Sequence, residues 1–169
     1  METDVELKSK FSNIFIMLLF GVMSNDLDNV RHFLGKDIYQ KYQGIINQNI
    51  KNNETQMFDE FNVKSIEIVS KKEFNDYYLV EVNIFSRYMD YVIDSDTKEY
   101  KRGINDRRVE KKNVLKFKKL KNDVQRSSVI KCEYCGANMD INFNGKCEYC
   151  GQFVDVTSYD YLLVDISTV

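Results

Sequence analysis

Two copies of one short cysteine motif are the feature of this sequence with the clearest chemistry. Residues 131–136 and residues 146–151 are identical, each with the letters K-C-E-Y-C-G, and the full spacing is C-x2-C-x11-C-x2-C. Each half is typical of a tight turn that directs two thiolates at one ion, and the Gly after the second cysteine permits the left-handed backbone that such turns need. Two such turns complete a tetrahedron, so we predict that one zinc ion is bound by Cys132, Cys135, Cys147 and Cys150.

A zinc ion held by four thiolates would be structural, because a catalytic zinc keeps one position open for water. Residues 129–154 would then form a zinc ribbon too small to fold without its metal, with a hairpin over residues 138–145 that turns at Asn144 and Gly145. The alternatives are a pair of redox C-x-x-C motifs or free thiols, and iron in place of zinc in the same four-thiolate frame.

The segment of residues 98–131 is strongly basic, although the whole chain has a net charge of −2. It contains 13 Lys and Arg against four Asp and Glu. The candidate anionic-surface contacts are Lys112, Lys116, Lys118 and Lys121. Such a surface would bind anionic lipid headgroups or RNA phosphates, but only Tyr100 and Phe117 are present in the segment to stack on bases. The alternative is a solvated outer sheet face, on which lysines also guard against edge pairing.

Two further residues are candidates for catalysis. His32 is the only histidine, and Asp90 could act as a pocket carboxylate near the end of a predicted strand. Each also has a structural interpretation, His32 as a surface or half-buried side chain and Asp90 as a turn or cap residue. The sequence has no Gly-rich phosphate loop and no nucleophile elbow, so we predict that the protein is not an enzyme.

The elements that must position these residues change from helices to strands along the chain. A long helix is expected over residues 4–23, apolar nearly all round in its second half and therefore deeply buried. A short second helix near residues 30–34 and a third over residues 38–50 follow it. Strands are expected over residues 61–69, 77–91, 98–104, 109–120 and 159–166. This order predicts an α+β fold, with helices on one face of a mostly antiparallel sheet and the ribbon inserted before the last strand.

Composition limits the size and the compartment of the protein. With 169 residues, 43% hydrophobic and 30% charged, the chain is expected to form one globular domain over residues 1–169, and the lack of Pro leaves no flexible linker. The longest apolar run, residues 14–23, is shorter than the roughly 17 residues that span a bilayer, and the acidic start is unlike a secretory signal. We therefore predict a cytoplasmic protein, peripheral at the membrane if it binds one, although a piece of a longer anchored protein would have the same composition.

The order of helices, strands and cysteine motifs resembles the Tim44-like domain family, whose bacterial members carry such a ribbon. The resemblance covers most of the chain and departs from the family in the absence of any Trp, with Leu115 and Tyr161 where the family tends to place one. The residues that carry it are residues 24–31, Tyr39, Tyr42, residues 90–94, Gly103, residues 115–117 and residues 159–163.

The resemblance implies a cone-shaped domain of the nuclear-transport-factor (NTF2-like) and cystatin-like type, in which a curved sheet wraps the first helix around a pocket. It also implies binding of proteins, membranes or small apolar ligands. Because one fold hosts many functions, the resemblance alone names no activity. We predict a non-catalytic binding or scaffold module with a structural zinc. The alternatives are a nucleic-acid-binding zinc ribbon and a small cone-fold enzyme.

Overall fold

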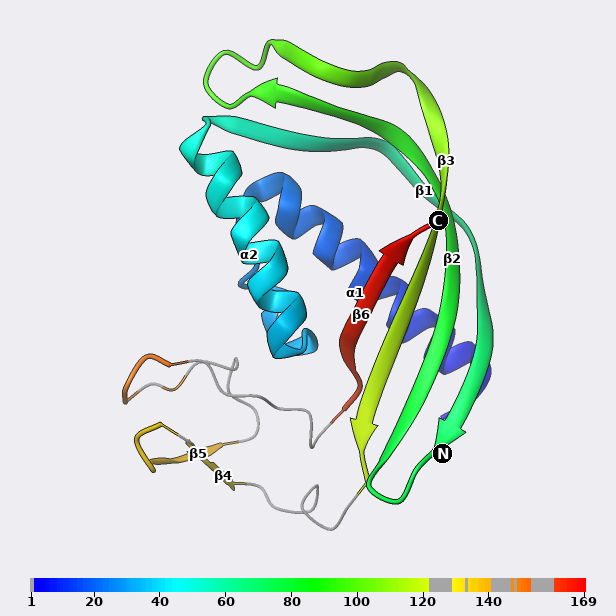
Figure 1. Cartoon of the computed structure of the whole chain (residues 1–169), viewed down its shortest axis with the longest axis vertical. Helices are drawn as coiled ribbons and strands as arrows, with labels where there is room; N and C mark the ends of the chain where they lie inside the picture. Colours follow the sequence, from blue (N-terminus) through cyan, green and yellow to red (C-terminus); the bar gives the residue numbers. More distant parts are fainter. Residues whose placement is uncertain (1, 122–128, 133, 141–146, 148, 153–159) are drawn as a thin grey trace.

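The computed structural model describes residues 2–121, 129–132, 134–140, 147, 149–152 and 160–169. Two α-helices pack against a four-stranded antiparallel sheet of strand order β1-β2-β3-β6, and β4 and β5 form a separate small hairpin. The elements are α1 (Asp4–Ser24), η1 (Arg31–Phe33), α2 (Lys36–Lys51), β1 (Glu54–Glu73), β2 (Tyr77–Asp94), β3 (Tyr100–Leu120), β4 (Val129–Lys131), β5 (Asn138–Asp140) and β6 (Leu162–Thr168). The predicted α+β class is confirmed, with both helices on the concave side of the curved sheet (Figure 1).

Helix α1 begins and ends where local chemistry dictates. Thr3 caps its N-terminus in a capping box with Glu6, and Asn25 ends it in the left-handed conformation with φ 55°. By length and composition alone α1 is apolar enough to cross a membrane, but here it packs on the sheet as a core helix. The predicted deep burial of its second half is confirmed for Ile14, Phe15 and Leu18 but not for Phe20, which is 58% exposed.

The long strands differ from the predicted ones in extent and continuity. β1 begins at Glu54, seven residues before the predicted start, and β3 is a single strand where two were expected. In the β2–β3 ladder Tyr88 pairs with Val109 while Asp90 pairs with Ile104, so residues 105–108 bulge out of β3. The β1–β2 ladder has three further register shifts, the first of them between Asp59 and Asn62. Because bulges bend and twist strands, these irregularities favour the curl of the sheet that Figure 1 shows.

The connection between the helices is tighter than predicted. The expected second helix is a short 3-10 turn, η1, whereas α2 matches the expected third helix. Gly35, which precedes α2, donates its N–H to the carbonyl of Leu163 in β6 at 2.8 Å. A Cβ at this position would lie 3.1 Å from the same carbonyl, so a residue without a side chain suits the close approach.

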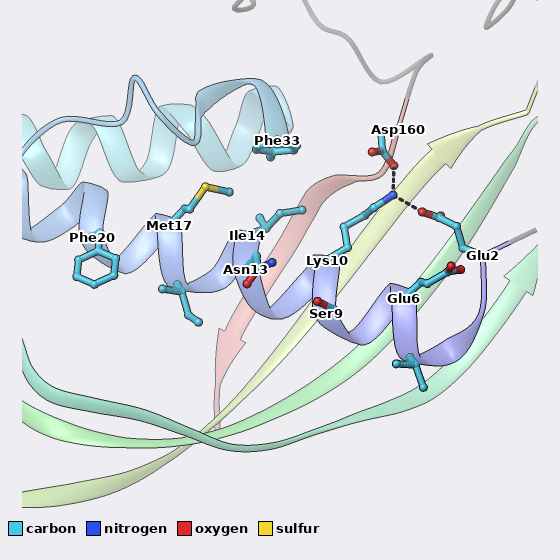
Figure 2. Close-up of a pocket in the computed structure, with 12 residues that line it drawn as sticks. Glu2, Glu6, Ser9, Lys10, Asn13, Ile14, Met17, Phe20, Phe33 and Asp160 are labelled. Carbon is cyan, nitrogen blue, oxygen red and sulfur yellow. Dashed lines mark hydrogen bonds and ion pairs between the residues drawn. The ribbon is translucent and has the colours of Figure 1, made fainter.

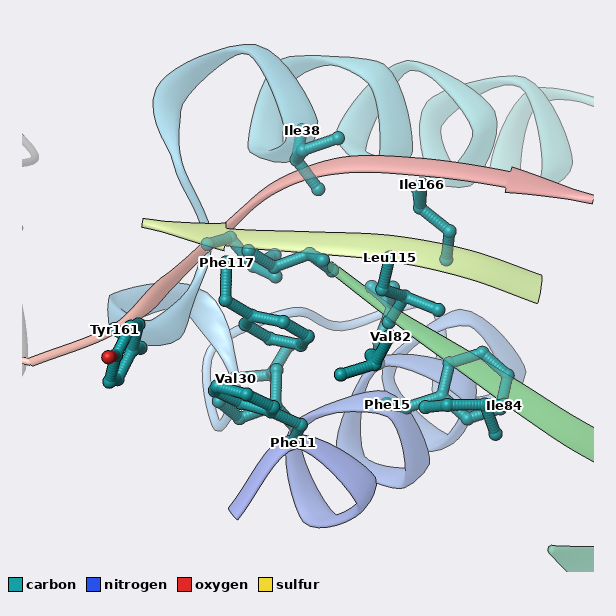
Figure 3. Close-up of a cluster of buried hydrophobic side chains, with 14 of the residues drawn as sticks. Phe11, Phe15, Val30, Ile38, Val82, Ile84, Leu115, Phe117, Tyr161 and Ile166 are labelled. Carbon is teal, nitrogen blue, oxygen red and sulfur yellow. The ribbon is translucent and has the colours of Figure 1, made fainter. Parts of the chain in front are cut away.

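The core lies between α1 and the concave face of the sheet (Figure 3). Phe11 of α1 stacks on Phe117 of β3 with ring centroids 3.9 Å apart, and Tyr161 meets Phe11 edge-on at 5.3 Å. Val82 and Leu115 extend this cluster from the two central strands, and both are fully buried. One helix therefore joins β3 to the start of β6.

Two phenylalanines of α1 provide a test of this arrangement. We expect Phe11→Ala to lower the free energy of unfolding by about 3–5 kcal/mol, because it opens a cavity against Phe117. The matched variant Phe20→Ala should change it by less than about 1 kcal/mol, since its ring is mostly in solvent. Urea denaturation followed by circular dichroism measures both, and equal losses would contradict the assignment of the buried face.

Candidate metal centre and surface groove

The four cysteines of the repeated motif come together. Their Sγ atoms all lie within 4.8 Å of one another. Cys132 and Cys150 are 3.7 Å apart, as are Cys135 and Cys147, so each close pair joins one motif to the other. Four sulfurs at about 2.3 Å from a central ion in a tetrahedron are about 3.8 Å apart, so this cluster has the dimensions of a four-thiolate metal site.

The two motifs adopt the same backbone turn. Gly136 donates its N–H to the carbonyl of Cys132 at 2.9 Å, and Gly151 donates to Cys147 at 2.8 Å. Both glycines are left-handed, with φ 78° and 75°, as their place in the motif predicts. The backbone N–H of Cys135 lowers the pKa of the Cys132 thiol to about 7, whereas burial and the neighbouring cysteines raise the pKa of Cys135 and Cys150.

The predicted hairpin of the ribbon is described only in part. β5, at its start, pairs with β4, and the register is Ile130 opposite Met139, so this pair of strands encloses the first cysteine motif. The predicted turn at Asn144 and Gly145 lies outside the described residues.

An open groove runs along the side of α1 that carries Phe20, and it has a volume of about 1080 Å³ (Figure 2). Side chains of α1 form its floor, Phe33 of η1 and Asp160 border it, and no residue of β1, β2 or β3 lines it. Lys10 crosses it, with its Nζ in ion pairs with Glu2 and, at 2.9 Å, with Asp160. Sequence reasoning missed this groove, because the resemblance placed a pocket between helix and sheet. The sequence did contain a sign of the groove. In its second half α1 carries more apolar residues than one buried face needs, and all of them were assigned to the core.

The lysines of the predicted basic face lie among carboxylates and rings. Lys112, Lys116 and Lys118 alternate with buried side chains of β3 and so share the outer face of the sheet. There Glu81 of β2 stands opposite Lys116, and Asp165 of β6 is 4.0 Å from the same Nζ.

The other lysines of this set also have neighbours. The ammonium of Lys118 lies 4.4 Å from the ring centre of Tyr77, and Lys121 forms an ion pair with Glu73 at 2.7 Å. Lys112 lies 5.9 Å from the ring centre of Phe85. The basic segment is thus part of a surface of mixed charge, and its contact with anionic surfaces stays a prediction.

The two candidate catalytic residues lie in different surroundings, and neither lines the groove. Asp90 is in β2, where it accepts a hydrogen bond from Gln56 at 2.7 Å and lies 3.5 Å from the Nζ of Lys111. His32 packs on Phe33 with ring centroids 4.1 Å apart. Burial and the neighbouring Arg31 lower the pKa of His32.

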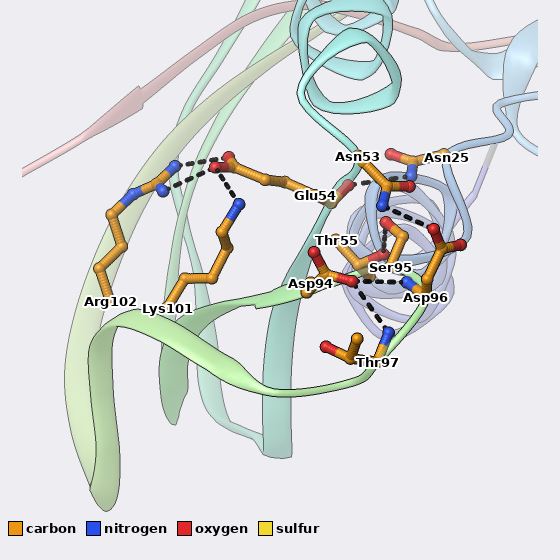
Figure 4. Close-up of polar contacts among 10 residues, drawn as sticks. All are labelled: Asn25, Asn53, Glu54, Thr55, Asp94, Ser95, Asp96, Thr97, Lys101 and Arg102. Atoms are coloured by element: carbon orange, nitrogen blue, oxygen red, sulfur yellow. Dashed lines mark hydrogen bonds and ion pairs between the residues drawn. The ribbon is translucent and has the colours of Figure 1, made fainter.

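A cluster of polar residues near the C-terminal end of α1 stabilises the curled end of the sheet (Figure 4). Glu54, the first residue of β1, is 7% exposed and accepts two hydrogen bonds from Arg102, at 2.9 and 2.8 Å, and one from Lys101 at 3.3 Å. The hydrogen bonds from Arg102, and to a lesser extent the one from Lys101, lower the pKa of the Glu54 carboxyl to about 2. Beside it, Asn25 donates to the carbonyl of Glu54 at 3.4 Å, which ties the end of α1 to β1.

The depressed pKa of Glu54 makes a pH-dependent contribution to stability. The ordinary value is 4.5, so the stabilisation is complete above about pH 4.5 and is lost as the pH falls towards 2. We expect Glu54→Gln to lower the melting temperature at pH 7 and the difference from wild type to shrink across that range. Glu67→Gln, at an exposed position of β1, is the matched control. A constant difference from pH 7 to pH 2 would contradict the role of the charge.

Comparison with known proteins identifies the family. A family model described as the Tim44-like domain matches residues 3–127, so the chain belongs to the Tim44-like domain family. The match extends from α1 through β3 and ends before the first cysteine. Among solved structures, the crystal structure of the intermembrane space region of chloroplast protein ARC6 is similar at a TM-score of 0.49 and 6% identity, over 100% of this chain and 98% of that chain. A search of curated proteins found no match.

Proposed function

We propose that this chain is a non-catalytic binding module of the Tim44-like family whose four cysteines hold one structural zinc ion. The observation that carries the metal assignment is the 3.7 Å spacing of the sulfurs across the two motifs, which matches tetrahedral zinc–thiolate geometry. Four ligands from the chain leave no open position for water, so the ion would stabilise structure and take no part in a reaction. The partner classes for such a module are a protein, a membrane surface and a small apolar ligand.

The zinc would brace the last strand of the sheet. In sequence the ribbon stands between β3 and β6, which pair directly, with Leu115 opposite Ile166. Asp160, just before β6, is held by Lys10 of α1. A folded ribbon therefore shortens the free chain between two paired strands, and this lowers the entropy lost when β6 docks.

Metal analysis tests the assignment directly. We expect reduced, freshly purified protein to contain one zinc per chain, and Cys132→Ser to lose most of it, because one of four thiolates is removed from a closed site. Elemental mass spectrometry measures both proteins, and circular dichroism of the helices checks that the variant is folded. Iron in place of zinc, no metal, or an unchanged content in the variant would each refute the proposal.

Removal of the metal should loosen one part of the fold before the rest. Because α1 and the long strands bury their own apolar surface, we expect chelation to speed hydrogen exchange in β6 while residues 14–19 of α1 stay protected. Mass spectrometry of exchanged peptides, with and without chelator, follows both segments in one sample. A uniform loss of protection would show that the whole domain depends on the metal.

A further inference from the structure

The groove along α1 has two chemically different ends. Towards the C-terminus of the helix it is apolar, with Ile16, Met17 and Phe20 on α1, and Phe33 of η1 borders it near Ile14 (Figure 2). Phe20 is 58% exposed, an unusual position for a large ring on a core helix. Exposed apolar surface gathered in one place, and not scattered singly, is typical of an interaction site.

The other end of the groove is acidic. Glu2, Glu6 and Asp160 line it beside Val5, and Lys10 is the one cation among the lining residues that the structure describes. That ammonium is already bound by Glu2 and Asp160, as Figure 2 shows, so its charge is compensated within the groove. Among the described lining residues, two negative charges therefore remain in excess at this end.

We propose that this groove binds an amphipathic helix of a partner protein, with apolar side chains at one end and Lys or Arg at the other. This inference rests on the proposed binding function and names the chemistry of its partner. The partner's apolar side chains pack on Met17, Phe20 and Phe33, and its cations lie against Glu6 and its acidic neighbours. Between Val5 and Phe20 the groove follows α1 for roughly 22 Å, which is the length of about four helical turns.

Two other occupants fit the charges less well. In an antiparallel pair of copies, Glu6 of one chain would face the apolar end of the other, and in a parallel pair the acidic ends would meet. An anionic membrane surface would be repelled by the same carboxylates. Complementary charge thus favours a basic, apolar segment from a different protein.

The test uses full-length, zinc-loaded protein and three labelled synthetic peptides of about 18 residues. One is an amphipathic helix of Leu and Lys, the second replaces every Lys with Glu, and the third has the Leu and Lys in scrambled order. Fluorescence anisotropy should show the first binding at least about tenfold more tightly than the other two, with an affinity that falls as salt rises.

Point variants locate the binding surface. Phe20→Ser should weaken binding of the first peptide by about tenfold or more, and Glu6→Gln, which can keep the helix cap, should weaken it less and reduce its salt dependence. Ile50→Ser and Glu67→Gln are the matched controls, because both residues are exposed and neither lines the groove. Neither control should change the affinity.

Several results would overturn the proposal. Equal binding of the three peptides, or binding insensitive to both groove variants, would show that the groove does not select a basic amphipathic helix. Phe20-dependent binding to vesicles of phosphatidylcholine and phosphatidylglycerol without peptide selectivity would assign it to a membrane. Phe20-dependent dimerisation in sedimentation would assign it to a second copy. Zinc is measured on the same samples, so the two proposals can fail separately. Protein that contains zinc but shows no peptide selectivity refutes this inference alone. Selective peptide binding by protein without zinc refutes only the metal assignment.

Discussion

The contact between Phe11 of α1 and Phe117 of β3 is the interaction on which the rest of the fold depends. The sheet is a single layer, so its apolar concave face must be covered, and α1 supplies the largest cover. Phe11 and Phe117 are fully buried and stack at 3.9 Å, in the middle of three strands and one helix. The bulges in β1 and β3 then allow long strands to curl around the helices, because a flat sheet of this length would extend beyond them.

The two ends of α1 are fixed by polar groups, and this leaves one flank of the helix open. At its C-terminal end Asn25 contacts β1 beside the Glu54–Arg102 pair, and at its N-terminal end Lys10 holds Asp160. Contact with the sheet uses the stripe that repeats every three to four residues and contains Phe11, Phe15 and Leu18, whereas Phe20 lies off this stripe and faces outward. An apolar ring such as Phe20 on that flank adds little to the core, which leaves it available to another molecule.

The features that sequence reasoning predicted are those set by neighbours along the chain. The cysteine turns depend on four consecutive backbone positions and a glycine, and the limits of α1 depend on Thr3 and Asn25 close to its ends. The errors concern contacts between distant segments. Residues 105–108 are polar and so looked like a break, although in the sheet they bulge while the ladder continues on both sides. Likewise, the basic segment gave no sign that Glu81 and Asp165 would lie beside Lys116, because strand pairing brings them there.

Asp160 connects the candidate metal centre to the groove. It stands between the ribbon and β6, it lines the acidic end of the groove, and it is bound to Lys10 in the groove floor. A ribbon folded around the proposed ion would restrict the chain on one side of Asp160, and the β3–β6 ladder restricts it on the other. These constraints, together with Lys10, would hold the carboxylate in place before the proposed partner binds, and a preformed acidic wall would reduce the entropy lost on binding. In this arrangement the proposed metal would act on the groove only indirectly, through the chain that carries Asp160.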